Sequence, residues 1–127
     1  MIAVDTSAIM AILLRETEAR DCMNVIQSEV GVVISAGTLA ETLIVASRQG
    51  IAKQAADFVR ELNFEVVPVT AASAKRSAEA YAVWGKGVHA AKLNYGDCFA
   101  YELAKERGCP LLFVGNDFAQ TDIKSAL

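Results

Sequence analysis

Short apolar runs rich in β-branched residues alternate with pairs of amphipathic segments along the whole chain. The runs cover residues 2–4, 32–35, 65–69 and 111–114. Apolar runs this short are typical of buried strands, and strands that are separated by helices favour parallel pairing. The order β-α-α-β-α-α-β-α-α-β therefore predicts an α/β fold with a mostly parallel central sheet covered by helices on both faces.

Six segments have helical periodicity, and polar or glycine residues mark several of their ends. Asp5 can cap the first helix, while Gly50 and Gly108 are natural stops for the third and the sixth. The turn after the third helix is short, which predicts a helical hairpin. Pro68 places the third strand at an edge of the sheet. The helical segments cover residues 6–14, 18–28, 38–49, 51–62, 71–84 and 96–107, and the tail from residue 121 is expected to form a single helical turn.

The composition is that of one globular domain, residues 1–127. The net charge of −3 gives no overall attraction to nucleic acid, so any such contact needs a local basic patch or metal ions. The three cysteines lack metal-site spacing, which indicates free thiols in a reducing cytosol. The N-terminus lacks signal-peptide features, and no apolar run approaches the ~20 residues of a membrane span. We therefore expect a cytoplasmic protein with no membrane contact.

Four acidic residues lie where an apolar run meets a helical segment: Asp5, Glu41, Asp97 and Asp117. The helices near Asp5 and Glu41 follow strands, whereas the helix near Asp97 precedes the fourth strand and so begins at the same edge. Asp117 follows the fourth strand directly. In a parallel sheet that edge carries the ligand crevice. Clustered carboxylates repel one another unless a cation neutralises them, and their oxygens suit Mg²⁺ or Mn²⁺.

Each of these acids also has a purely structural explanation. Asp5 suits an N-cap, and Glu41 is the last residue of a capping-box pattern that begins at Thr38. Asp97 falls in a first helical turn, where the helix dipole favours a carboxylate, and Asp117 can form an Asx turn. For a single residue the structural explanation is the stronger one. The convergence of all four on one edge favours a shared site.

Such a site predicts the hydrolysis of a phosphodiester. A divalent ion lowers the pKa of bound water and neutralises charge in the transition state, so no histidine base is required. This fits a chain with one histidine. That residue, His89, lies in a loop with two glycines, where we expect a surface or capping role.

A basic stretch with aromatic residues runs from residue 75 to residue 92. Its members are Lys75, Arg76, Tyr81, Trp84, Lys86 and Lys92. Cations interleaved with aromatic rings suit a single-stranded nucleic acid path. A solvated helix with its tryptophan in the core explains the pattern equally well, and the same apolar surface could bind a partner helix.

Four segments together resemble the PIN-domain family, and more narrowly the VapC ribonuclease toxins of bacterial type II toxin–antitoxin pairs. They are Val4-Asp5-Thr6-Ser7-Ala8, Ala40-Glu41-Thr42, Leu93-Asn94-Tyr95-Gly96-Asp97-Cys98-Phe99-Ala100-Tyr101 and Phe113-Val114-Gly115-Asn116-Asp117-Phe118. The resemblance implies a three-layer α/β/α sandwich with four or five strands and an endoribonuclease that depends on Mg²⁺ or Mn²⁺. It also implies a homodimer and a VapB-like antitoxin whose C-terminal segment blocks the acidic cleft.

The resemblance extends to the roles of the acids. Asp5 and Asp97 match the principal metal ligands, and Glu41 matches an acid that binds the metal or orients its water. Many family members carry an Asp at the position of Gly115 and a second at that of Asp117. Only the second is present here.

The fourth role therefore falls to Asp117, with Asp122 as the alternative. A hydroxyl of Thr6 or Ser7 is expected to fix the orientation of a carboxylate.

Two other classes of function remain open from the sequence. A phosphotransfer or phosphatase module that uses Mg²⁺ would have a similar α/β form. A dehalogenase-type site needs an acid where Ser7 stands, and a receiver-type site needs a lysine that residues 115–117 do not supply. A PIN-like binding module that has weak or no catalysis is the other alternative, and the presence of four acids disfavours it.

Overall fold

A fully parallel four-stranded sheet lies at the centre of the computed structural model, which describes residues 1–127. The strands are β1 (Ile2–Val4), β2 (Val32–Ser35), β3 (Glu65–Val67) and β4 (Leu111–Leu112). Their spatial order is β3-β2-β1-β4, and every neighbouring pair is parallel. Both the parallel sheet and the edge position of the third strand confirm the sequence predictions.

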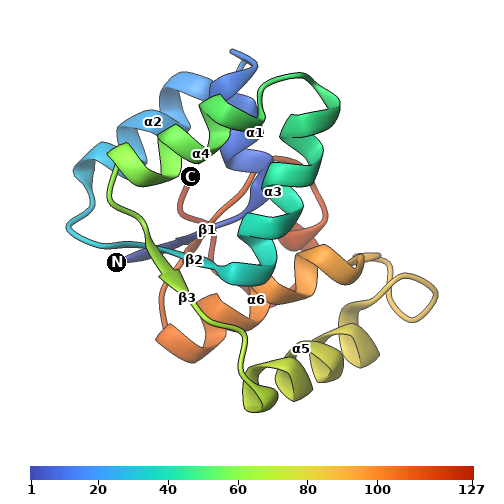
Figure 1. The fold of residues 1–127 in the computed structure, drawn as a ribbon. Helices are drawn as coiled ribbons and strands as arrows, with labels where there is room; N and C mark the ends of the chain where they lie inside the picture. The colour runs from blue at the N-terminus through green and yellow to red at the C-terminus, as the bar shows by residue number, and fades with distance from the viewer.

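Helices cover both faces of this sheet (Figure 1). They are α1 (Thr6–Leu13), α2 (Ala19–Ser28), α3 (Ala36–Arg48), α4 (Ala52–Glu61), α5 (Ala71–Trp84) and α6 (Tyr95–Arg107), followed by a 3-10 turn, η1 (Phe118–Gln120). The order of elements is the predicted one. Helices α1, α2 and α4 lie on one side of the sheet and α5 and α6 on the other, while α3 contacts helices of both layers. The predicted three-layer α/β/α architecture is confirmed.

The strand residues alternate between two apolar cores. Ala3 and Val33 point to the face covered by α6, where they pack with Leu103 and other residues of that helix. Their neighbours Ile2 and Ile34 point to the opposite face and pack against α1, α2 and α4. Because the side-chain period of a strand is two, a run of consecutive apolar residues is needed to bury both faces. This is why the strands lack polar alternation.

The start of α3 differs from the prediction. The helix begins at Ala36, and the Ser35 hydroxyl caps it by accepting from the backbone N–H of Gly37 at 3.2 Å. The predicted capping box at Thr38 and Glu41 is therefore wrong, because the last residue of β2 already supplies the cap. Glu41 lies inside the helix, and its carboxylate is free for another role.

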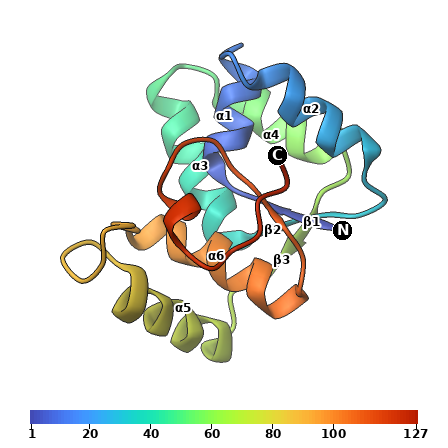
Figure 2. The same cartoon turned by 180° about the vertical axis from the view of Figure 1, so that it is seen from behind.

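The C-terminal segment also differs from the prediction. Helical geometry occurs at η1, before residue 121, and the chain then runs beside β4 and parallel to it (Figure 2). The backbone N–H of Leu111 donates to Lys124 O at 2.9 Å, and Ala126 N–H donates to Leu111 O at 3.0 Å. This segment covers the free edge of β4, in the place of a fifth strand. Strand β4 itself has two residues rather than the four predicted.

Helix α5 lies farthest from the sheet and packs mainly on α6 (Figure 1). A capping box between Thr70 and Ser73 fixes its start.

All three cysteines are free, and Cys22 and Cys98 are buried. No helix combines the length and the apolar character that crossing a bilayer requires.

Candidate metal and active site

Asp5 is the most deeply buried of the four candidate acids. It follows β1 directly and caps α1, where its Oδ2 atom accepts from the N–H of Ser7 at 3.0 Å and from the Ser7 hydroxyl at 2.7 Å. Its other carboxylate oxygen, Oδ1, is buried and has no hydrogen-bond partner. Burial, with a smaller contribution from the charge of Glu41, raises the pKa of Asp5 to about 6 against the lowering effect of the Ser7 bonds.

Ser7 is the hydroxyl that orients this carboxylate. Its Oγ atom also accepts from the backbone N–H of Val114 at 3.0 Å, so it joins Asp5 to the segment that follows β4. Thr6, the other predicted candidate, instead hydrogen-bonds the Thr42 hydroxyl at 2.9 Å. That buried pair joins α1 to α3, and neither hydroxyl bonds a carboxylate.

Asp97 lies in the first turn of α6, where it forms a capping box with Asn94. Asp97 Oδ2 accepts from the N–H of Asn94 at 2.9 Å, and Asn94 Oδ1 accepts from the N–H of Asp97 at 2.8 Å. Burial, with smaller contributions from the charges of Asp5, Glu41 and Asp117, raises the pKa of Asp97 to about 7 against the lowering effect of the Asn94 bond. The other three predicted acids therefore each lie within electrostatic range of Asp97. The Asn-x-x-Asp spacing is a capping-box pattern, and the sequence analysis missed the part that Asn94 plays.

Glu41 reaches the site from α3. Its carboxylate lies against Gly96 of α6, so closely that a Cβ atom at that position would be 2.5 Å from Glu41 Cδ. Asp117 is exposed, precedes η1 and makes no side-chain hydrogen bond, so the predicted Asx turn does not form. Gly115, two residues earlier, has a φ of +105°, which L-residues rarely adopt.

Asp122 lies in a different network. Its Oδ1 accepts from the Tyr101 hydroxyl at 2.6 Å and its Oδ2 accepts from Lys105 Nζ at 3.0 Å. Trp84 Nε1 in turn donates to the Tyr101 hydroxyl at 3.0 Å. The Tyr101 hydrogen bond holds the pKa of Asp122 below its ordinary value. Of the two candidates for the fourth acid, Asp117 is the one whose charge raises the pKa of Asp97.

The donor set fits a hard divalent cation. The acids supply only carboxylate oxygens, and the buried, unpartnered Oδ1 of Asp5 has the desolvation cost of a polar atom that lacks its partner. No three His, Cys, Asp or Glu side chains already stand at metal-ligand spacing. Mutual repulsion opposes closer approach of the carboxylates until a cation compensates it. Asp5, Asp97, Glu41 and Asp117 are the residues that would hold the ion.

The basic stretch of residues 75–92 is only partly available to a nucleic acid. Arg76 forms an ion pair with the buried Glu102 at 2.7 Å and a longer one with Glu106. Trp84 is half-buried and packs edge-on against the His89 ring, with centroids 4.7 Å apart. His89 Nδ1 accepts from the N–H of Ala91 at 2.9 Å, which is the local capping role expected for it. Three lysines of the stretch remain exposed: Lys75, Lys86 and Lys92.

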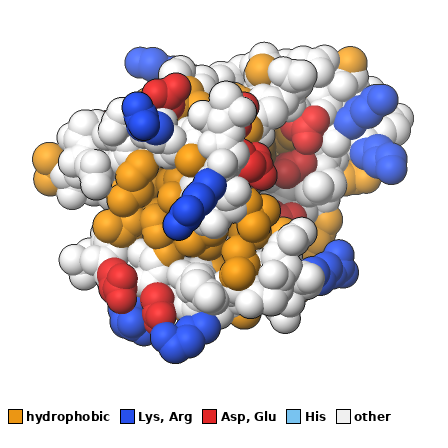
Figure 3. All heavy atoms as spheres, turned by 90° about the horizontal axis from the view of Figure 1, so that it is seen from above, with side chains coloured by type: hydrophobic (Ala, Val, Ile, Leu, Met, Phe, Trp, Pro, Cys, Tyr) orange, Lys and Arg blue, Asp and Glu red, His pale blue; other side chains and the backbone are white.

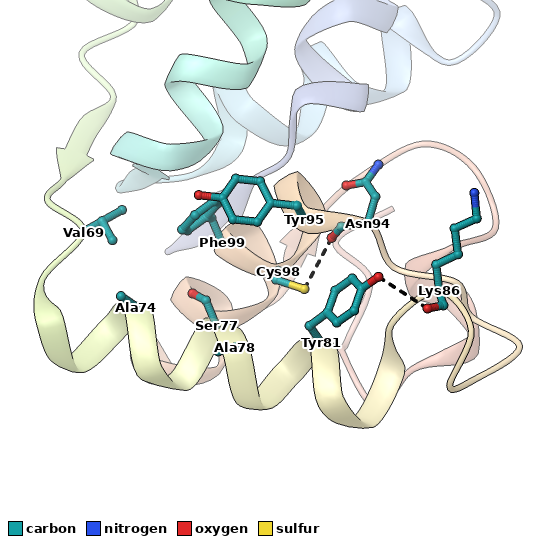
Figure 4. Close-up of a pocket in the computed structure, with 10 residues that line it drawn as sticks. All are labelled: Val69, Ala74, Ser77, Ala78, Tyr81, Lys86, Asn94, Tyr95, Cys98 and Phe99. Atoms are coloured by element: carbon teal, nitrogen blue, oxygen red, sulfur yellow. Dashed lines mark hydrogen bonds between the residues drawn. The ribbon is translucent and has the colours of Figure 1, made fainter.

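An apolar groove of about 520 Å³ separates α5 from the start of α6 (Figure 4). Ala74, Ala78 and Tyr81 line it from α5, and Tyr95 and Phe99 line it from α6. The Tyr95 ring is 78% exposed although it stacks edge-on against Phe99. A mostly apolar lining suits a protein partner better than a phosphate backbone.

Charge is unevenly distributed over the surface. On the face seen in Figure 3, acidic side chains gather in a hollow beside a broad hydrophobic patch, and Lys and Arg side chains lie mainly towards the periphery. A concave acidic surface concentrates cations.

The sequence matches the PIN domain family over residues 2–124. Ribonuclease VapC28 of Mycobacterium tuberculosis is 40% identical over 98% of this chain and 96% of its own length. Ribonuclease VapC30 of the same species is 37% identical over 94% of each chain. Among solved structures, the Mycobacterium tuberculosis toxin VapC20, described as cleaving the sarcin-ricin loop, superposes with a TM-score of 0.78. It is 20% identical, and the match covers 97% of this chain and 96% of VapC20.

Proposed function

The chain belongs to the PIN domain family, and we propose that it is a VapC-type endoribonuclease that hydrolyses RNA phosphodiester bonds with the help of a divalent metal ion. The observation that carries this proposal is the pair of buried acids Asp5 and Asp97, both raised in pKa, with the charges of Glu41 and Asp117 acting on Asp97. Perturbed acids in a crevice are typical of functional sites. Curated relatives near 40% identity that are named ribonucleases support the same reaction.

The proposed roles follow from the positions of the side chains. Asp5 and Asp97 are the principal metal ligands, Glu41 binds the ion or orients water beside it, and Asp117 completes the acidic pocket. Ser7 keeps Asp5 Oδ2 occupied and leaves Oδ1 as the free ligand atom. When bound, a divalent ion supplies Lewis-acid chemistry to water and to the phosphodiester.

PIN-domain VapC ribonucleases generally depend on divalent metal, and the ion proposed here is Mg²⁺ or Mn²⁺. We further propose the cytoplasm as the compartment, since the three cysteines are free thiols. A VapB-like antitoxin is the proposed inhibitor, and its C-terminal segment would block the acidic cleft.

A homodimer completes the proposal. The apolar groove between α5 and α6 is the surface we assign to the second copy, because Tyr81 and Tyr95 leave aromatic surface exposed to solvent there. The alternative outcome of the test is that the antitoxin, and not a second copy, fills this groove.

The function is tested by cleavage of defined RNAs with purified protein in Mn²⁺, in Mg²⁺ and in EDTA. We expect cleavage only with metal, and its loss in Asp5→Asn and in Asp97→Asn at unchanged far-UV circular dichroism. Asp21→Asn, an exposed acid on α2, is the matched control and should cleave like the wild type. Metal binding without cleavage of any RNA would replace the nuclease with a PIN-like binding module. Cleavage of phosphomonoesters alone would favour the phosphatase alternative.

A further inference from the structure

Gly96 stands at the second position of α6, between the exposed ring of Tyr95 and the candidate ligand Asp97. Its backbone does not require glycine, because the positive-φ glycines are Gly50, Gly87, Gly108 and Gly115. Alanine is a better helix former than glycine. Gly96 is also buried, so its glycine is not explained by an exposed position that tolerates any residue.

The space around Gly96 gives the explanation. A Cβ atom there would lie 3.0 Å from Oε1 of Glu41, 2.5 Å from its Cδ and closer still to Oε2. Real Cβ atoms do not approach other heavy atoms at such distances, so something must move. The obstacle is the end of a flexible side chain. By contrast, a Cβ at Gly85 would meet the backbone carbonyl of Tyr81, which cannot move without unwinding α5.

We propose that Gly96 is a positioning residue for the metal site: the missing side chain leaves the space in which the Glu41 carboxylate rests beside Asp97. The Glu41 carboxylate lies against Gly96, the residue that directly precedes Asp97 in α6. A methyl group at residue 96 pushes this carboxylate out of the cluster and leaves the fold intact. This inference rests on the proposed function, because it treats Glu41 as one of the metal-binding acids.

The steric relationship is tested first, without metal. Thermal midpoints in EDTA are measured for wild type, Gly96→Ala, Glu41→Ala and the double variant. In the Glu41→Ala background the new methyl group meets no carboxylate, so Gly96→Ala should raise the midpoint more there than in the wild type. If Gly96→Ala changes the midpoint equally in both backgrounds, residue 96 does not contact the Glu41 carboxylate.

The role in metal binding is tested by titrating the same four proteins with Mn²⁺ in a calorimeter. Gly96→Ala should weaken Mn²⁺ binding by roughly 10-fold or more, the range found when groups that orient a metal ligand are removed. In the Glu41→Ala background it should weaken binding no further, because the carboxylate on which it acts is absent. The matched control is Gly31→Ala, where a Cβ has no neighbour nearer than 4.0 Å, and it should bind Mn²⁺ like the wild type.

The outcomes separate this inference from the proposed function. A wild-type protein that binds no Mn²⁺ contradicts the proposed function and the positioning role together, while the melts in EDTA still decide the contact. Mn²⁺ binding that is normal in Gly96→Ala, or a loss that is equally large with and without Glu41, contradicts the positioning role and leaves the nuclease proposal intact. Lower thermal midpoints with normal Mn²⁺ affinity would make Gly96 a packing residue only.

Discussion

The Ser7 hydroxyl donates to Asp5 Oδ2 at 2.7 Å and at the same time accepts from the Val114 N–H at 3.0 Å. One side chain therefore links the capping residue of α1 to the segment that follows β4, across 107 residues of sequence. It fixes which oxygen of Asp5 is occupied by the protein and which is left for a ligand.

Removing this hydroxyl should weaken the metal site. Ser7→Ala frees Asp5 to rotate and removes a bond that lowers its pKa, so Mn²⁺ affinity should fall by roughly 10- to 100-fold. Calorimetric titration with Mn²⁺ measures the effect. Ser7→Thr, which keeps the hydroxyl, should recover most of the affinity. Equal affinity in Ser7→Ala and wild type would show that the orientation of Asp5 does not depend on Ser7.

The metal-free protein should become less stable as the pH rises from about 4.5 to 7.5. Asp5 and Asp97 have folded-state pKa values of about 6 and about 7 against an ordinary value of 3.8, so the native state holds their protons longer than the unfolded chain does. Between the unfolded-state pKa of 3.8 and the folded-state values, the native state binds more protons than the unfolded chain does. The free energy of unfolding therefore falls as the pH rises. At ~1.4 kcal/mol per pKa unit the loss is a few kcal/mol.

Urea unfolding in EDTA across this pH range measures that loss. Asp97→Asn should flatten the curve, and saturating Mn²⁺ at pH 7.5 should restore stability because the ion favours the charged carboxylates. A metal-free stability that rises over the same range would contradict the burial of these acids.

The two candidates for the fourth acid should behave differently. Asp117→Asn removes a charge that acts on Asp97, so it should reduce Mn²⁺ affinity and the rate of RNA cleavage, with no loss of stability. Asp122→Asn removes the ion pair with Lys105 and the charge that strengthens the Tyr101 bond, so it should lower stability by about 1 kcal/mol, with normal Mn²⁺ affinity. Unfolding in urea and Mn²⁺ titration of both variants separate the two effects. The reverse pattern would assign the fourth role to Asp122.

A charge in the apolar groove should dissociate the proposed homodimer. Ala78→Glu places a carboxylate among the lining side chains, which is costly when the groove is covered. Light scattering after gel filtration should then give a single-chain mass. Ala72→Glu carries the same substitution on an exposed position of α5 outside the groove and should remain dimeric. If the wild type is a monomer and only an antitoxin protects the groove, this surface belongs to the inhibitor.

The sequence predicted the order of elements and the nearness of the other three acids to Asp97, because both follow from topology. In a parallel sheet, Asp5 and Asp117 must reach the same edge, wherever they lie along the chain. The sequence analysis missed the residue that caps α3, because two nearby hydroxyl side chains could take that position. Ser35 caps α3 in place of Thr38 because strand β2 ends in a hydroxyl residue that is already at the right position.

Other features depend on contacts that no local pattern records. The sequence left open a nucleic acid path that included Arg76, but Glu102 of the neighbouring helix α6 forms an ion pair with it. The contact between Gly96 and Glu41 likewise joins α6 to α3 and depends on how closely these helices pack. Single-sequence patterns give the face of a helix but not the distance to its neighbour.

The backbone at Gly115 limits how this loop can change. Many PIN domains carry an aspartate at that position, but here φ is +105°, where a side chain introduces strain. Gly115→Asp would therefore not simply return the missing carboxylate to the pocket. A side chain at this position requires the loop backbone to be rebuilt, so a carboxylate ligand cannot be added to this loop by one substitution alone.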